Sequence, residues 1–209
     1  SGFNIAMQDL DIRGAGNLLG AEQSGFISDM GFETYQKILS EAMEELGMET
    51  GIHTSSTEDG YIADTTVETD QLALIPDEYM SVTAEKIRIY KELDSITDFK
   101  TLKKMKEDME DRFGKMPIET ERLFDIVKIR QIAGKIGLEK VIIKNGLLIM
   151  FFISNQMSPF YKSGRFEKVL EHINENGNLF EFKQSDGKIK LLSRNVDSIS
   201  KALSLMEKL

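Results

Sequence analysis

The stretch VIIKNGLLIMFFI, residues 141–153, decides the fold class of the C-terminal part of this chain. Two apolar runs flank Asn145–Gly146, a residue pair that two-residue hairpin turns favour, because both of its residues tolerate positive φ. A second hairpin is predicted around Asp186–Gly187, with strands at 179–183 and 188–192. Two antiparallel hairpins are therefore expected in one sheet.

Helices are expected on either side of these hairpins. We predict them at residues 83–94, 98–113, 117–137 and 162–176. A last helix should begin near Asn195 as its N-cap and bury Ile199, Leu203 and Met206. Weak alternation over residues 64–70 favours one more strand. The sequence thus predicts an α/β (α+β) fold over residues 61–209, with antiparallel hairpins packed on helices and Phe151, Phe152 and Phe160 in the core.

The N-terminal part differs from this domain in composition. Residues 1–30 are rich in glycine, and residues 31–47 have the apolar spacing of one amphipathic helix that ends at Gly47. Residues 48–60 are small and polar, which is typical of a linker. We therefore divide the chain into a helical hairpin or loop with its helix at 1–47, a linker at 48–60 and a domain at 61–209.

Composition limits the classes of function. The chain contains no cysteine, which excludes disulfides and thiolate metal sites, and we expect no metal site and a cytoplasmic location. No apolar run is long enough to span a membrane. The formal net charge of −9 argues against a free-standing nucleic-acid binder. The acidic surface is either simply solvated or faces a basic partner. Because Ser1–Gly2 opens the chain without Met or a basic segment, we expect a piece of a longer protein rather than a signal peptide.

Residues 9–25 read DLDIRGAGNLLGAEQSG. The Gly14–Ala15–Gly16 step does not complete a dinucleotide fingerprint, because Leu19 occupies the place of the third glycine. It does not form a phosphate-binding P-loop either, because no Gly-Lys-Ser/Thr follows. From the residues alone, this segment is a glycine-hinged turn that carries one cation, Arg13, and one amide, Gln23. A purely structural turn remains an alternative.

This segment is similar to the motif that follows the second helicase lobe in RecG-type helicases and in transcription-repair coupling factors. The matching positions are Asp9, Leu10, Ile12, Arg13, Gly14, Gly16, Leu18, Leu19, Gly20, Gln23, Ser24 and Gly25. The resemblance implies a hairpin that couples ATP hydrolysis to translocation on double-stranded DNA, through Arg13 and Gln23 and with Gly14, Gly16 and Gly20 as its hinges. Arginine suits such a role because it stays charged while it changes hydrogen-bond partners.

Later segments resemble the coupling factors rather than the RecG-type enzymes. They are LIPDEY at 74–79, IYKEL at 89–93, MEDRFGKMP at 109–117 and a match over 129–140. The resemblance implies that the parent protein is an ATP-dependent DNA translocase that displaces stalled RNA polymerase and recruits nucleotide excision repair. ATP and Mg would bind the motor lobes of that parent. For this chain we expect no catalytic residue, no cofactor and no ATPase activity of its own.

The last domain of that family is implied to be an autoinhibitory clasp. It would pack on an intramolecular UvrB-like module and hide the surface that recruits UvrA. Asp108 and Asp111 lie where the family presents acidic contacts, three residues apart on one helix face. Carboxylates near a helix C-terminus oppose the helix dipole, a cost that a basic partner would relieve. The alternative for this helix face is a solvated surface that Lys104 and Arg112 partly neutralise. The alternative for the chain as a whole is a stand-alone protein-interaction module without a motor.

Overall fold

The computed structural model describes residues 65–209. Among them it contains five α-helices, one 3-10 helix and five strands. In chain order these are β1 (Thr66–Thr69), α5 (Thr83–Ser95), α6 (Phe99–Phe113), α7 (Ile118–Lys135), β2 (Leu138–Lys144), β3 (Leu147–Phe152), η2 (Pro159–Lys162), α8 (Gly164–Glu175), β4 (Glu181–Ser185), β5 (Lys188–Arg194) and α9 (Ile199–Met206). The predicted hairpin and helix at 1–47 and the linker at 48–60 lie outside the described residues. The predicted α/β fold is confirmed.

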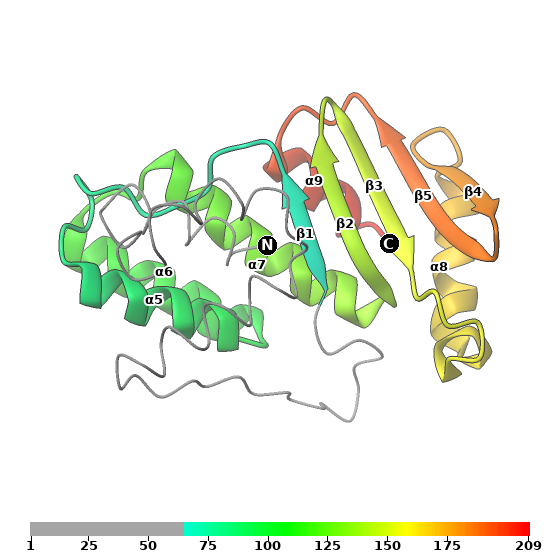
Figure 1. Ribbon diagram of the computed structural model, residues 1–209, viewed down its shortest axis with the longest axis horizontal. Helices are drawn as coiled ribbons and strands as arrows, with labels where there is room; N and C mark the ends of the chain where they lie inside the picture. Colours follow the sequence, from blue (N-terminus) through cyan, green and yellow to red (C-terminus); the bar gives the residue numbers. More distant parts are fainter. Residues whose placement is uncertain (1–64) are drawn as a thin grey trace, which may run out of the picture.

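The five strands form one mixed sheet in the order β1-β2-β3-β5-β4 (Figure 1). The strand β1 runs parallel to β2, and α5, α6 and α7 make the crossover between them. All other neighbouring strands are antiparallel. Both predicted turns are present, because Asn145 and Gly146 have φ of 53° and 72°, and Asp186 and Gly187 have φ of 49° and 71°.

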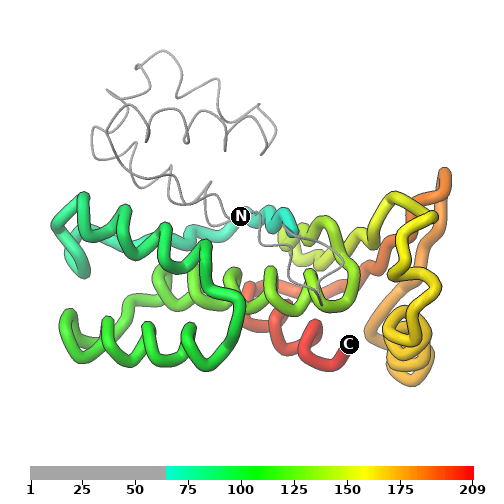
Figure 2. The backbone as a smooth tube through the Cα atoms, turned by 90° about the horizontal axis from the view of Figure 1, so that it is seen from below, coloured from blue at the N-terminus to red at the C-terminus, as the bar shows by residue number. Residues whose placement is uncertain are grey.

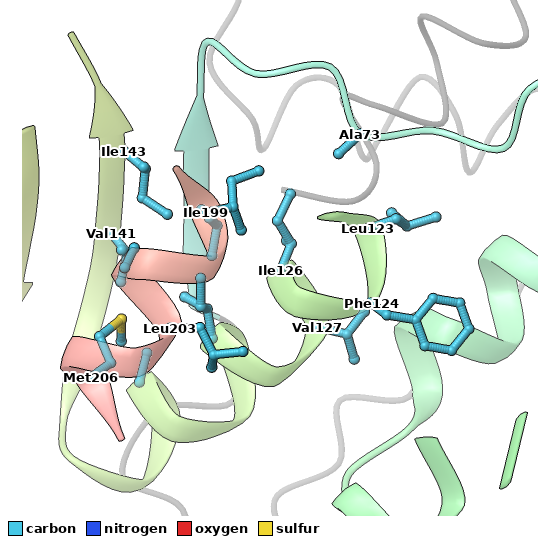
Figure 3. Packing of buried hydrophobic residues seen from close by; sticks show 14 of the residues in the cluster. Ala73, Leu123, Phe124, Ile126, Val127, Val141, Ile143, Ile199, Leu203 and Met206 are labelled. Atoms are coloured by element: carbon cyan, nitrogen blue, oxygen red, sulfur yellow. The ribbon is translucent and has the colours of Figure 1, made fainter. Parts of the chain in front are cut away.

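The main core lies on one face of the sheet. Val141 and Ile143 of β2 point toward Ile199, Leu203 and Met206 of α9, all of them buried (Figure 3). Figure 2 shows α7 and α9 on this side of the strands, with α8 at the far end of the sheet from β1. The helices α5 and α6 lie beyond the sheet and pack on α7 (Figure 1).

Several predicted boundaries are wrong, among them that of the strand predicted at 179–183, which spans Glu181–Ser185. The third helix ends at Lys135 rather than residue 137, because Gly137 has φ of 74° and turns the chain into β2, which begins three residues earlier than predicted. The helix expected at 162–176 is split into η2 and α8. The last helix is capped by Ser198, which accepts a hydrogen bond from the Lys201 amide. Asn195 is instead a left-handed turn residue with φ of 59°.

The core prediction is wrong for one aromatic residue. Phe152 and Phe160 are 2% and 0% exposed in the main core, but Phe151 points to the opposite face of the sheet and is half-buried there. Successive residues of a strand alternate between faces, so Phe151 and Phe152 cannot both face α9. This alternation gives the sheet a second, partly apolar face.

Candidate protein-interaction site on helix α6

Helix α6 is positioned by its cap and by one apolar stripe. The Asp98 carboxylate caps the helix by accepting a hydrogen bond from the Thr101 amide at 2.8 Å, and this bond lowers the pKa of Asp98. Leu102, Met105 and Met109 repeat at the helical spacing and are buried. The helix ends at Gly114, whose φ of 85° suits glycine. One side of α6 is therefore fixed to the domain and the other is exposed.

Asp108 and Asp111 lie on that exposed side, one turn apart near the C-terminal end. Both side chains are exposed. Neither carboxylate has an ion-pair partner within residues 65–209. The helix C-terminus carries partial negative charge, so the Asp111 carboxylate in the last turn is slightly unfavourable where it lies, and the Asp108 carboxylate one turn earlier is less so. The structure thus leaves two adjacent negative charges available to a partner.

Arg112 does not neutralise this pair. Its guanidinium forms an ion pair with Glu85 of α5 and lies over the Phe113 ring, 4.8 Å from the ring centroid. Lys104 has no ion-pair partner within the described part of the chain. The alternative in which Lys104 and Arg112 offset Asp108 and Asp111 is therefore not supported by ion pairs in the structure.

The acidic end of α6 is held in place from a second direction. The Tyr79 hydroxyl donates to the Gly114 carbonyl at 3.1 Å, and its ring lies 5.8 Å from the Phe113 ring. Burial, and then the negative charge of Glu110, raise the pKa of Tyr79, so the phenol stays protonated and keeps its donor. A charged surface fixed in this way loses little conformational freedom on binding.

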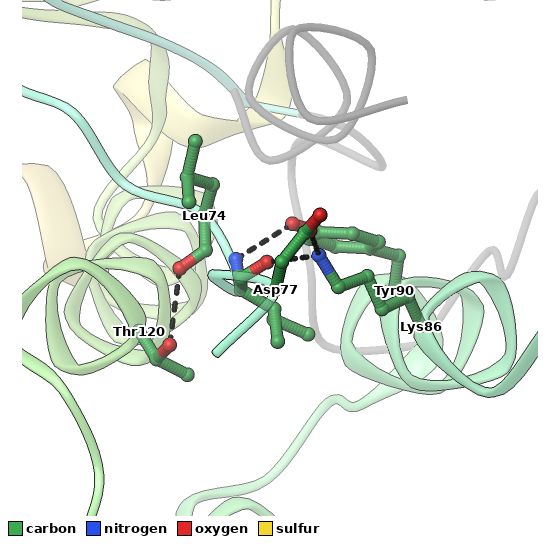
Figure 4. A network of polar contacts seen from close by, with 6 residues as sticks. Leu74, Asp77, Lys86, Tyr90 and Thr120 are labelled. Carbon is green, nitrogen blue, oxygen red and sulfur yellow. Dashed lines mark hydrogen bonds and ion pairs between the residues drawn. The ribbon is translucent and has the colours of Figure 1, made fainter. Parts of the chain in front are cut away.

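A buried polar network supports the segment from which Tyr79 projects (Figure 4). Lys86 is 0% exposed, and its ammonium donates to the Ile75 carbonyl and, at 2.8 Å, to the Asp77 carboxylate. The Tyr90 hydroxyl accepts from the Ile75 amide at 2.9 Å. A buried lysine is tolerated only when it is paired and hydrogen-bonded, as it is here.

Helix α7 holds the same segment from its other side. The Thr120 hydroxyl donates to the Leu74 carbonyl at 3.0 Å, and the Leu74 amide donates to the Glu119 carbonyl at 3.1 Å. The sequence interpretation missed this network. The helical spacing of the sequence indicated it, because Lys86 lies on the same helix face as the buried Ile89 and Leu93 and therefore points inward.

The remaining predicted site residues belong to the N-terminal segment. Arg13, Gln23, Gly14, Gly16 and Gly20 lie outside the described residues. Within residues 65–209, no group of three or more His, Cys, Asp or Glu side chains is arranged to hold a metal ion. No helix in this part of the chain is both long and apolar enough to cross a membrane.

Comparisons with known proteins identify the family and the fold of the described residues. Residues 69–163 match the TRCF domain. The fold resembles a solved structure described as the C-terminal domain of transcription-repair coupling factor, with a TM-score of 0.57 and 19% identity over 69% of this chain and 92% of that one. The described residues therefore form an α/β domain of the TRCF type.

Relatives extend the match beyond this domain. The transcription-repair-coupling factor of Rickettsia typhi is 34% identical over 200 residues, which is 94% of this chain and 17% of the relative. That of Staphylococcus epidermidis is 44% identical over 141 residues, 68% of this chain and 12% of the relative. The chain belongs to the transcription-repair-coupling factor family, and it spans less than a fifth of the length of these relatives.

Proposed function

We propose that this chain is the C-terminal part of an ATP-dependent DNA translocase that displaces stalled RNA polymerase and recruits nucleotide excision repair in the cytoplasm. In this proposal residues 1–47 couple ATP hydrolysis to translocation. Residues 61–209 form a clasp that masks the UvrA-binding module until the protein is engaged. Family membership supports the parent activity, since the relatives are named for coupling transcription to repair.

The acidic end of α6 carries the clasp proposal. Asp108 and Asp111 are exposed, lack ion-pair partners within residues 65–209, and lie on a helix end fixed by Tyr79 and by the Arg112–Glu85 pair. A basic patch on the UvrB-like module would neutralise both carboxylates and the C-terminal end of the helix dipole. Such a contact would be strong enough to close the clasp and weak enough for a ligand to open it.

The test is UvrA capture by the longer protein with Asp108→Lys and Asp111→Lys. These changes should repel a basic patch, open the clasp and raise UvrA binding by about tenfold, since two close charge contacts contribute on the order of 1–2 kcal/mol. A matched control is Glu171→Lys with Glu175→Lys on α8, which makes the same charge change at two other exposed carboxylates. Equal UvrA binding by both double variants would remove α6 from the proposal.

The coupling role of the N-terminal segment needs a separate test. Arg13→Ala or Gln23→Ala in the longer protein should abolish displacement of a DNA triplex strand while ATP hydrolysis continues. Normal strand displacement by both variants would count against the assigned role. The second candidate function, an interaction module without a motor, would be favoured if this sequence were encoded with no helicase lobes before it.

A further inference from the structure

The open face of the sheet has a composition unlike the rest of the chain. The register of the strands assigns to this face, opposite α7 and α9, the side chains of Thr66, Glu68, Lys140, Ile142, Lys144, Leu147, Ile149, Phe151, Glu181, Lys183, Ser185, Lys188, Lys190, Leu192 and Arg194. No described helix packs on it (Figures 1 and 2).

An apolar row crosses the centre of this face. Ile142, Ile149 and Leu192 lie directly opposite one another on β2, β3 and β5. Leu147 and Phe151 extend this row along β3. None of the five belongs to the main core cluster. Leu192 is buried, at 8% exposed, whereas Ile142, Leu147, Ile149 and Phe151 are half-buried and form the accessible part of the row. Three adjacent strands span about 10 Å, which is about the diameter of one α-helix with its side chains.

Cations surround the apolar row. The face carries six of them against two anions, Glu68 and Glu181, in a chain whose formal net charge is −9. The six are Lys140, Lys144, Lys183, Lys188, Lys190 and Arg194. This face therefore carries a net positive charge, although the chain as a whole is acidic.

Both anions of this face already form ion pairs within it. Glu68 pairs with Lys140 at 2.7 Å and with Lys144 at 3.4 Å. Glu181 pairs with Arg194 at 2.7 Å and with Lys183 at 3.4 Å. Each of the two glutamates neutralises at most one positive charge, so an excess of positive charge remains on this face.

Lys188 and Lys190 carry that excess. Neither has an ion-pair partner within residues 65–209. Lys190 also lies directly opposite Lys183 on β4. Like charges at directly opposite positions destabilise a strand pair. An anionic partner would relieve this repulsion.

We propose that this open face binds an acidic amphipathic helix of a partner protein, with apolar side chains on Ile142, Ile149 and Phe151 and carboxylates on Lys188 and Lys190. A protein helix fits better than a nucleic acid. Nucleic acid bound on a sheet is held by stacking on exposed aromatic rings, and this face has only Phe151, which is half-buried. Branched aliphatic side chains match the apolar stripe of a helix instead. This proposal does not depend on the α6 clasp.

The test uses the whole 209-residue chain. The probe is a synthetic amphipathic helix of about 18 residues with leucine on one side and glutamate on both flanks. The peptide should bind, and Lys188→Glu with Lys190→Glu should weaken binding by about tenfold or more. The double variant should fold normally, because the carboxylate introduced at position 190 would face Lys183. Lys104→Glu with Lys208→Glu, at two exposed lysines elsewhere, makes the same charge change and should leave binding intact.

Methyl NMR of the same chain locates the bound peptide. The signals of Ile142 and Ile149 should shift on titration, while those of buried Ile126 and Ile199 should not. Failure of the peptide to bind, equal loss in both double variants, or shifts confined to other methyl groups would overturn the proposal. Tighter binding of a short single-stranded or duplex oligonucleotide at Lys188 and Lys190 would assign the face to nucleic acid instead.

Discussion

The Lys86 network and the acidic end of α6 use charge in opposite ways. Lys86 is fully buried, and its ammonium is matched by a carboxylate and a carbonyl. Asp108 and Asp111 are exposed and unmatched by any ion pair within residues 65–209, at the helix end where negative charge is least favourable. The first arrangement stabilises the domain. The second contributes no ion pair to the domain, and a basic partner surface could complement it.

Removal of the buried ammonium should have the largest effect. Lys86→Ala leaves the Ile75 carbonyl without its buried donor and opens a cavity, so the free energy of unfolding should fall by about 2–4 kcal/mol. Urea denaturation followed by circular dichroism measures this change. A loss below about 1 kcal/mol would mean that the network contributes little and that the contrast with α6 is false.

Thr120→Val removes one hydrogen bond from the other side of the same segment. The Leu74 carbonyl would lose its buried donor, at a cost of about 1 kcal/mol. Ser204→Ala is a suitable control, because its hydroxyl donates to the Ser200 carbonyl on an exposed helix surface. Equal small effects of the two changes would show that α7 does not hold this segment through Thr120.

Glu68 is an intermediate case, because it is a partly exposed carboxylate with two partners. Burial raises the pKa of Glu68, but the hydrogen bonds and charges of Lys140 and Lys144 outweigh it and leave the pKa below its ordinary 4.5. A depressed pKa contributes stability that is present above about 4.5 and is lost as pH falls through the folded-state value. Glu68→Gln should therefore flatten the decline of stability below pH 4.5. Thermal melts at a series of pH values measure this decline. If the melting temperature fell equally below pH 4.5 with and without Glu68→Gln, that result would contradict the Lys140–Glu68–Lys144 contact.

The smallest effect should have the opposite sign. Asp108→Asn with Asp111→Asn removes two charges that oppose the dipole of α6, so the isolated chain should gain a few tenths of a kcal/mol, up to about 1 kcal/mol. High salt should reduce this gain by screening. A clear loss of stability instead would show that these carboxylates have a structural role within the domain.

The sequence predicted what depends on local conformation. Asn145–Gly146 and Asp186–Gly187 impose positive φ, and Gly114 ends α6, so both hairpins and the helix end were predictable from residue type. Asn195 was misassigned as the N-cap because it and Ser198 are both good caps, and the choice between them is made by packing.

Features that depend on tertiary packing were not predictable in this way. The placement of β1 beside β2 joins segments about 70 residues apart, which no local pattern encodes. Lys86 was missed because lysine is rarely buried, although its helical phase pointed inward. Asp108 and Asp111 were predicted from the family resemblance; the structure adds that Arg112 pairs with Glu85 and does not offset them.

Titration calorimetry of this chain with the isolated UvrB-like module of the same protein tests the central proposal most directly. Binding should be saturable, should weaken with added salt and should be reduced by about tenfold or more by Asp108→Lys with Asp111→Lys. Glu171→Lys with Glu175→Lys should leave it unchanged. Binding that is insensitive to the α6 charge reversal would contradict the account.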